Sequence, residues 1–281
     1  MLVTRVITAL VLLAVLGSVL LWGGDQGWLA FVAVVLFASF WEWARLGLFS
    51  NQSALLYAAL GTALYLLIEL ATSGSAIVFP FLALSGVFWV AFAPWCLMQV
   101  SIGLLQSRNW YFLTGLVLMP AAGLALTSAH KQGFVFLLSV IAICWVADIF
   151  AYVFGKLFGK RKLAPKISPG KSWEGAVGGT LTVVALSWLV ILLANHLPVF
   201  KQSWQYQAYE QWPAVLFTLW IVALSAISIA GDLFESLLKR RADMKDSSSL
   251  LPGHGGVLDR IDAQLPVLPL AMLLLGAAGT V

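Results

Sequence analysis

Long apolar segments separated by short polar ones dominate the pattern of the chain. A bilayer core about 30 Å thick takes about 20 helical residues to cross. Nine apolar segments approach or exceed this length: Val6–Gly23, Trp28–Leu46, Ala54–Ala71, Ile77–Leu105, Trp110–Ser128, Phe134–Phe154, Ala176–Leu197, Pro213–Gly231 and Leu265–Val281. None alternates polar and apolar residues as a barrel strand would. Since only helices and closed barrels satisfy their backbone in lipid, the pattern predicts an all-α bundle of about nine transmembrane spans.

The fourth segment, Ile77–Leu105, leaves two alternatives open. It is longer than a span requires, and Pro94 interrupts it. A proline inside a helix removes a hydrogen bond and bends or breaks the helix. The segment is therefore either one tilted, kinked span or two short re-entrant pieces.

Composition supports the membrane interpretation. The 281 residues are 61% hydrophobic and only 10% charged, whereas soluble domains average about 45–50% apolar and about 25% charged residues. The two cysteines, Cys96 and Cys144, lie apart in apolar segments. They provide neither a disulfide framework nor a thiolate metal site, and we interpret both as small core residues.

Charge placement predicts the orientation of the spans. With the N-terminus in the cytoplasm and nine crossings, 14 of the 16 basic residues fall inside, and only Lys131 and Lys201 fall outside. This distribution obeys the positive-inside rule. Splitting the fourth segment would place both large basic loops outside. We therefore expect a multi-pass protein of the inner membrane with its polar loops on the cytoplasmic side.

The N-terminal apolar run is interpreted as a retained first span. No small-residue cleavage site closes it, and further apolar segments follow at once, which argues against a signal peptide. We divide the chain into N-terminal scaffold helices facing lipid, residues 1–130, and C-terminal helices carrying the catalytic loops, residues 131–281. The net charge of +4 arises mainly from two membrane-flanked loops, which indicates phosphate-bearing ligands or anionic lipid and not nucleic acid.

Acidic residues concentrate in or beside the same two loops. Eight of the 12 are found there: Asp148, Glu174, Asp232, Glu235, Asp243, Asp246, Asp259 and Asp262. An ionisable group at a membrane edge is costly unless it is paired, hydrated or bound to metal. An ordinary ion pair with a nearby lysine remains an alternative for any one of them.

The spacing of the acids predicts convergence. Asp232, Glu235, Ser236 and Lys239 share one face of a helix, at offsets 0, 3, 4 and 7. Asp259 and Asp262 share a face if their stretch is helical. Several carboxylates converging beside basic residues suit a hard cation such as Mg²⁺.

Two glycine-bearing stretches favour phosphate binding. Gly170, Lys171 and Ser172 form a predicted turn that opens a helix, where backbone N–H groups attract anions. A P-loop would require glycine at position 165, where Pro165 stands, and a preceding strand, which we do not predict. Gly253, Gly255 and Gly256 flank His254 and allow close approach of the backbone to an anion. The alternatives are a positive-inside stop signal for the first stretch and a histidine that only bonds its own loop for the second.

These residues together carry a specific resemblance. Ser236, Leu238, Lys239 and Arg240, then Lys245 and Asp246, then the run from Leu251 through His254 and Asp259 to Asp262, resemble the signature of phosphatidate cytidylyltransferases. Asp148, Ala151 and Tyr152, with Phe158, Gly159 and Lys160, and the stretch from Ser168 to Glu174 resemble the bacterial members. Trp41, Glu42 and Trp43 are a weaker match. Ser248, where glycine is expected, and the Gln264–Pro266 stretch are departures.

The resemblance implies transfer of CMP from CTP to phosphatidate at a membrane, with Mg²⁺ and a monovalent cation such as K⁺ as cofactors. It assigns Asp232, Asp259 and Asp262 to the metal. Catalytic roles go to Asp246, Lys239, Arg240, His254 and Arg260. Substrate binding goes to Lys160, Ser168, Lys171, Ser172, Glu174, Asp148, Ser236, Lys245, Gly255 and Gly256. CTP, phosphatidate and membrane lipid are the expected partners, with a homodimer as one alternative for the oligomeric state.

Two other functions stay open at this point. A CTP-dependent polyprenol kinase shares the nucleotide but accepts a lipid alcohol, and therefore needs a general base. An ion or solute transporter also uses intramembrane acids, but it would place them near the midplane of broken helices. The acids of this chain cluster at the cytoplasmic edge of the predicted spans, which counts against transport.

Overall fold

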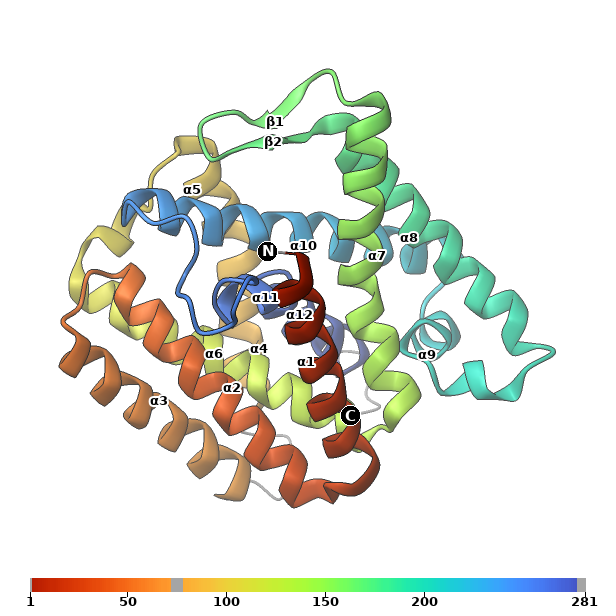
Figure 1. The fold of residues 1–281 in the computed structure, drawn as a ribbon. Helices are drawn as coiled ribbons and strands as arrows, with labels where there is room; N and C mark the ends of the chain where they lie inside the picture. The colour runs from red at the N-terminus through yellow and green to blue at the C-terminus, as the bar shows by residue number, and fades with distance from the viewer. Residues whose placement is uncertain (1, 72–77, 277–281) are drawn as a thin grey trace.

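The structure is a computed structural model that describes residues 2–71 and 78–276. Helices make up most of it, and one two-stranded sheet is added (Figure 1). The helices are α1 (Leu2–Trp22), α2 (Gly24–Leu46), α3 (Asn51–Ala71), α4 (Val78–Val87), α5 (Ala93–Gln99), α6 (Arg108–Lys131), α7 (Phe134–Phe158), α8 (Trp173–Ala194), α9 (Trp204–Gln211), α10 (Ala214–Arg241), α11 (Leu258–Ile261) and α12 (Gln264–Gly276). Shorter elements are η1 (Phe88–Phe92), η2 (Gly103–Gln106), η3 (Pro198–Gln202), β1 (Lys162–Ala164) and β2 (Ser168–Ser172).

The predicted all-α polytopic bundle is confirmed. Within the described residues, eight helical segments are long and apolar enough to cross a membrane. The ninth predicted segment, Leu265–Val281, corresponds to α12, whose 13 described residues are shorter than a span; the end of that segment lies outside the described residues. The number of crossings and their orientation therefore stay predictions.

The fourth segment forms one helical run from Val78 to Gln99. A π-helical turn, η1, separates α4 from α5, and Pro94 lies at the start of α5. Proline has no N–H to donate and its ring crowds the preceding turn, and a widened π turn accommodates both effects. The described residues thus favour the single-helix alternative. Ile77 lies outside them.

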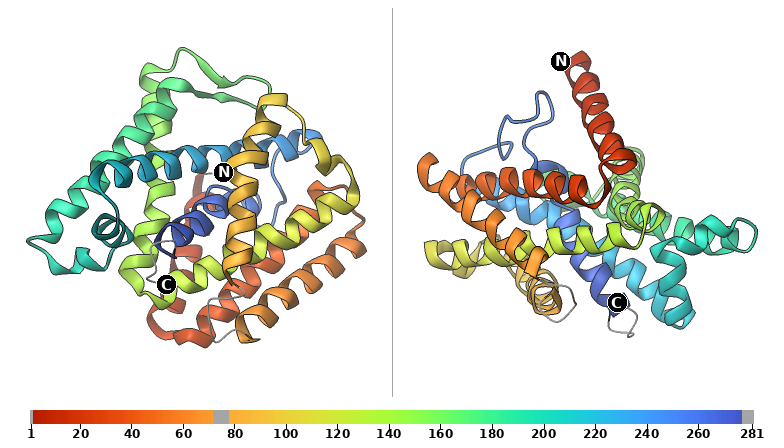
Figure 2. Two further views of the ribbon diagram at one scale, coloured as in Figure 1. Left: turned by 180° about the vertical axis from the view of Figure 1, so that it is seen from behind. Right: turned by 90° about the horizontal axis from the view of Figure 1, so that it is seen from below.

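Apolar side chains divide between a packed interior and a lipid-type exterior. Trp43, Trp89 and Trp204 are fully buried, whereas Leu181 and Val215 are exposed although they lie on apolar helices. Lipid is as apolar as these side chains, so the exposed ones have a suitable solvent. Helix α1 is the extreme case: no residue of Thr4–Trp22 is buried, and the helix projects from the rest of the chain (Figure 2).

Helices α7 and α8 pack closely where they join the β1–β2 hairpin. A Cβ at Gly175 would stand 2.5 Å from the Ala151 carbonyl oxygen, and one at Gly179 would stand 2.6 Å from that of Ala147. Only glycine allows this approach. These close contacts fix the end of α7 against the start of α8.

Strands β1 and β2 form an antiparallel hairpin between α7 and α8, with Lys162 opposite Ser172 and Ala164 opposite Ser168. The predicted turn at residues 170–172 is therefore wrong, since Lys171 lies within a strand. Pro165 stands in the connection between the strands, which suits its fixed φ. The prediction that a helix opens here is confirmed, because Ser172 caps α8 by accepting a hydrogen bond from the Gly175 N–H.

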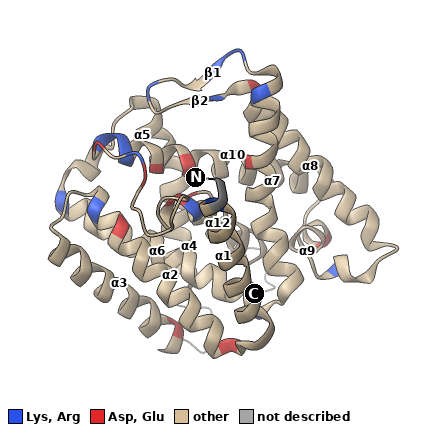
Figure 3. Cartoon of the chain, viewed as in Figure 1, with Lys and Arg blue, Asp and Glu red and all other residues tan. Residues whose placement is uncertain are grey.

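Basic residues gather toward one side of the molecule. Figure 3 shows Lys and Arg concentrated near the β1–β2 hairpin and α5, and acidic residues next to them toward the interior. The C-terminal end of α10 supplies three consecutive cations, Lys239, Arg240 and Arg241. This side contains the polar clefts described below.

Candidate active site

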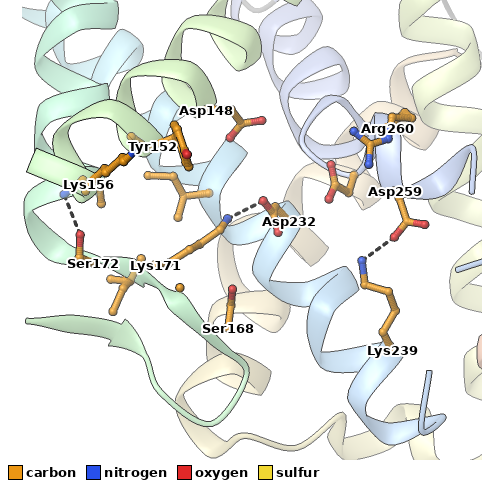
Figure 4. Close-up of a pocket in the computed structure, with 18 of the residues that line it drawn as sticks. Asp148, Tyr152, Lys156, Ser168, Lys171, Ser172, Asp232, Lys239, Asp259 and Arg260 are labelled. Atoms are coloured by element: carbon orange, nitrogen blue, oxygen red, sulfur yellow. Dashed lines mark hydrogen bonds and ion pairs between the residues drawn. The ribbon is translucent and has the colours of Figure 1, made fainter. Parts of the chain in front are cut away.

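A cleft of about 760 Å³ opens where α7, β2, α10 and α11 meet. Figure 4 shows its polar side chains pointing toward one another from these separate elements. Ten of the predicted site residues line it: Asp148, Ser168, Lys171, Ser172, Asp232, Lys239, Asp246, Asp259, Arg260 and Asp262. The convergence expected from helical spacing is therefore present.

Acidic and basic groups alternate across this cleft. Lys171 Nζ lies 2.5 Å from Asp232 Oδ2, which joins β2 to α10. Lys239 Nζ lies 2.6 Å from Asp259 Oδ1, which joins α10 to α11 (Figure 4). Lys239 also contacts Glu235 one turn earlier on α10. The shared face predicted for α10 is confirmed by these contacts. Each lysine neutralises an acid that would otherwise repel its neighbours.

The Asp259 carboxylate has several donors. Besides Lys239, it accepts hydrogen bonds from the Ser247 N–H and the Gly256 N–H, both at 2.8 Å, and from Ser247 Oγ at 2.9 Å. Burial alone would raise the pKa of Asp259, but Lys239 and these N–H donors outweigh burial and lower it below its ordinary value. Asp259 therefore stays ionised.

Asp262 has the opposite environment. Burial raises the pKa of its carboxyl well above the usual range, and the charges of Asp232 and Asp148 raise it further. The Ala263 N–H donates to Asp262 Oδ1 at 2.7 Å and only partly offsets these effects. A group of hard oxygen donors that repel one another in this way suits a divalent cation, which would remove the repulsion.

The three predicted metal ligands line one cleft, but they are not gathered into a preformed metal centre. In the described ranges, no three Asp, Glu, His or Cys side chains lie together at metal-binding spacing. Lysines hold two of the three predicted carboxylates, Asp232 and Asp259. The donor chemistry fits a hard cation at Asp262, and Asp232 and Asp259 are available to it only when Lys171 and Lys239 leave them.

Sequence comparison places the chain among known proteins. The profile of the cytidylyltransferase family matches residues 3–278. The chain is 39% identical over 288 residues to a phosphatidate cytidylyltransferase of Pseudomonas aeruginosa, covering 99% of this chain and 98% of the relative. A phosphatidate cytidylyltransferase of Brucella abortus is 33% identical over 273 residues, covering 92% and 87%. One from Haemophilus influenzae is 46% identical over 138 residues, covering 49% and 44%.

The chain belongs to the cytidylyltransferase family. The family resemblance inferred from the motifs is thereby confirmed. It is a multi-pass membrane member, since eight of its described helices have spanning length and composition.

Some residues carried over from the family signature lie away from the cleft. Glu174 accepts hydrogen bonds from the Lys160 N–H and the Arg161 N–H, so it closes the base of the hairpin. The His254 N–H donates to the Leu251 carbonyl within its own loop. The predicted residues that do not line this cleft are Lys160, Glu174, Ser236, Arg240, Lys245, His254, Gly255 and Gly256.

The positions of these residues suggest supporting functions for several of them. Gly255 has φ of +84°, a conformation that favours glycine. The Gly256 N–H holds Asp259, and Ser236 Oγ lies 3.4 Å from Asp232 Oδ1. They shape the loop and the acids and do not face the cavity. Arg240 lines a different cleft.

Glu42 of α2 is a site residue whose function the sequence did not indicate. Its buried carboxylate accepts hydrogen bonds from the N–H groups of Val257 and Leu258, at 2.9 and 2.6 Å. Ser248 Oγ donates to it at 2.5 Å, and the single hydroxyl proton of Ser247 is shared between Glu42, at 3.1 Å, and Asp259. One side chain thus fixes both ends of the segment that leads to Asp259. The weak family match at residues 41–43 was the only sign of Glu42 in the sequence, and it did not indicate which residues Glu42 contacts.

Tyr152 and Lys156 of α7 also line the cleft. They stand four and eight residues after Asp148, so helical spacing from that acid could have found both. Lys156 adds another cation beside β2. Lys156 therefore joins Lys171, Lys239 and Arg260 as a fourth basic residue of the cleft.

Proposed function

We propose that the protein transfers CMP from CTP to phosphatidate, giving CDP-diacylglycerol and pyrophosphate. The observation that carries this proposal is the cleft in which Lys171, Lys239 and Arg260 alternate with the acids of α7, α10 and α11. The reaction must bring two anions together, and such a cleft neutralises both. The named relatives are phosphatidate cytidylyltransferases, which supports the same substrates.

The chemistry requires positioning more than proton transfer. A phosphate oxygen of phosphatidate attacks the α-phosphorus of CTP, and the bond between that phosphorus and the bridging oxygen of the β-phosphate breaks. Pyrophosphate leaves with the bond's electron pair. The nucleophile is already anionic at neutral pH, so no strong general base is needed. The acids are therefore free to hold cations.

Three basic residues of the cleft have a proposed task. Lys171 and Lys239 exchange their carboxylate partners for substrate phosphates, and Arg260 provides a further charge from α11. Departure of the lysines frees Asp232 and Asp259 as ligands. Ser168 and Ser172 present hydroxyl groups from β2, and Tyr152 covers the same cleft from α7.

We propose Mg²⁺ as the cofactor, held by Asp232 and Asp262 and joined by Asp259 when Lys239 turns to substrate. Bound Mg²⁺ supplies charge neutralisation at the phosphates. Asp148 and Asp246, which line the same cleft, are the residues we assign to a monovalent cation such as K⁺ or to the substrate.

Location follows from the two substrates. Phosphatidate resides in the bilayer and CTP in the cytoplasm, so a site at the cytoplasmic edge of the inner membrane is accessible to both. The basic loops around the cleft support this orientation by the positive-inside rule.

Product analysis tests the proposal directly. The purified protein should be incubated with phosphatidate, Mg²⁺ and CTP labelled at either the α- or the γ-phosphate. We expect the α-label in the lipid and the γ-label in pyrophosphate. In a parallel incubation with a polyprenol in place of phosphatidate, transfer of the γ-label to the polyprenol would show a kinase instead. In proteoliposomes, solute flux without CTP turnover would show a transporter.

A further inference from the structure

A second cleft of about 590 Å³ lies between the end of α5, the β1–β2 hairpin turn and the end of α10, and we call it the α5–α10 cleft. Its walls are the loop from α5 into η2, the hairpin turn at Lys166 and the end of α10 at Arg240 and Arg241. Among the described residues, none lines both clefts. Lys239 faces the active cleft and its neighbour Arg240 faces this one, so the end of α10 separates them.

The charge of the α5–α10 cleft is entirely positive. Lys166, Arg240 and Arg241 line it, and none of the three forms an ion pair with an acid in the described ranges. Arg240 Nε only donates to the Ile167 carbonyl, at 3.4 Å. This contrasts with the active cleft, where lysines are paired with acids. Three adjacent cations without a counter-ion attract an anion with several oxygen acceptors.

The wall opposite these cations has an unusual backbone. Val100, a β-branched residue, has φ of +51°, and Gly103 has φ of +52°. Ser101 Oγ braces the turn between them by accepting from the Gly103 N–H at 3.3 Å and from Gln106 Nε2 at 3.4 Å. Left-handed conformations at β-branched residues are strained and cluster at ligand sites.

Exposed apolar side chains next to this wall indicate the kind of anion. Met98 and Leu104 are 81% and 61% exposed, and Trp95, also exposed, lies over Gly103. Tryptophan beside basic residues is typical of the membrane interface. A free nucleotide or phosphate ion would bind the cations but would make no favourable contact with the apolar side chains. A lipid would contact the cations with its headgroup and the apolar side chains with its acyl chains.

We propose that the α5–α10 cleft binds the phosphate headgroup of an anionic glycerophospholipid, with the acyl chains along the exposed apolar residues of α5 and η2. The site is separate from the active cleft and does not depend on turnover. Each cation near an anionic lipid adds to the affinity, so removing two of them weakens binding by about tenfold or more.

The test measures lipid binding to the full chain in detergent by native mass spectrometry. The probe is phosphatidylglycerol, which is neither substrate nor product of the proposed reaction, and phosphatidylcholine with the same acyl chains is the neutral comparison. We expect preferential binding of phosphatidylglycerol. The Lys166→Gln, Arg241→Gln double variant should lose this preference, and Lys166→Arg with Arg241→Lys should retain it.

A charge-matched control lies on the same hairpin. Arg161→Gln with Lys162→Gln removes two cations that do not line the cleft, and this variant should bind phosphatidylglycerol like the unmodified chain. Equal loss in both double variants, or no preference for phosphatidylglycerol in the unmodified chain, would overturn the proposal. Full competition by millimolar inorganic phosphate would overturn the lipid assignment. Asp232→Asn should bind the lipid normally, so failure of this site and failure of the proposed reaction are distinguishable.

Discussion

At the residue scale, the active cleft is organised by lysine–carboxylate pairs that join different elements. Lys171 connects β2 to Asp232 of α10, and Lys239 connects α10 to Asp259 of α11. Each pair is partly shielded from water, so loss of one partner leaves a charge without compensation. The pairs therefore hold the cleft together as well as supplying charge for substrate, and substitutions can separate the two functions.

Substitution of Lys171 by alanine should impair turnover far more than substitution of Lys162. Lys171 faces the cleft, whereas Lys162 is exposed on β1 and does not line it. Since one charge-assisted phosphate contact contributes about 1.5–3 kcal/mol, we expect kcat/KM to fall by about tenfold to 100-fold in Lys171→Ala. Steady-state kinetics with CTP and phosphatidate measure the change. Equal, mild effects from both variants would favour a general attraction to the membrane surface.

The acids should divide into two groups when each is changed to asparagine. Asp232→Asn and Asp262→Asn should lose activity by orders of magnitude, because metal neutralisation of phosphate charge contributes several kcal/mol. Asp262→Asn should keep its thermal stability without Mg²⁺, since the change relieves repulsion from Asp232 and Asp148. Asp259→Asn should lose both activity and stability, because it weakens the hydrogen bonds of Ser247 and Gly256.

Specific activity per folded protein, with thermal unfolding measured with and without Mg²⁺, separates these outcomes. Near-normal activity in Asp262→Asn would contradict its assignment to the metal. Undiminished stabilisation by Mg²⁺ in all three variants would place the metal elsewhere.

If Asp262 holds the proposed Mg²⁺, metal binding has a pH dependence of definite sign. Its pKa is raised in the folded chain, so folding takes up a proton between the unfolded pKa, about 4, and the higher folded value. Stability of the metal-free protein should therefore fall as pH rises through this window. A cation displaces the proton, so the apparent affinity for Mg²⁺ should increase with pH. Thermal unfolding measured as a function of Mg²⁺ concentration, at about pH 5.5 and about pH 8, gives this change in apparent affinity. The same pH dependence of Mg²⁺ affinity in Asp262→Asn as in the unmodified chain would contradict the assignment.

At the scale of elements, α2 controls a loop that is more than 200 positions away in sequence. Glu42 accepts two backbone and two hydroxyl hydrogen bonds from the segment between α10 and α11. This segment contains little regular secondary structure, and α11 at its end has only four residues. An isolated turn of helix is not stable by itself. The carboxylate of Glu42 therefore positions Asp259 through the loop that carries it.

Glu42→Gln should release this loop. The amide presents an N–H₂ group to backbone donors, so at least one of the four contacts is lost, and each hydrogen bond to a charged group contributes about 1.5–3 kcal/mol. Hydrogen exchange at Val257 and Leu258 should accelerate, and kcat should fall. Glu69→Gln is the matched control, because Glu69 pairs with the exposed Lys131 away from the cleft. Unchanged exchange in Glu42→Gln would contradict the positioning function.

At the scale of the whole molecule, orientation decides whether both substrates can enter. The predicted topology places the hairpin and the α10–α11 loop in the cytoplasm. Ser249 and Pro169 are exposed positions in these loops, and Gln132 and Gln202 are exposed on the predicted outer side. Single cysteines there, in a background without the buried Cys96 and Cys144, report the side of each loop. Labelling of Ser249→Cys from outside intact cells would reject the topology.

Much of the fold was predictable from the sequence, and the reason is physical. Transfer of an apolar segment into lipid depends on its own side chains and hardly on its partners, so hydrophobic runs predicted the helices. The shared face of Asp232, Glu235 and Lys239 needs only helical geometry, and it was confirmed in α10. The start of α8 at Ser172 is a local capping interaction and was predictable for the same reason.

The tertiary structure decided which charges meet. Asp259 binds Lys239, Arg240 faces a second cleft, and Glu42 reaches Leu258; none of these contacts follows from local spacing. The strand around Lys171 was missed because it exists only by pairing with β1. The sequence by itself determined that these residues are polar groups at the ends of membrane helices. Contacts between segments far apart in the chain depend on the packing of whole helices, and that packing alone determined which residues form the cleft and which support it.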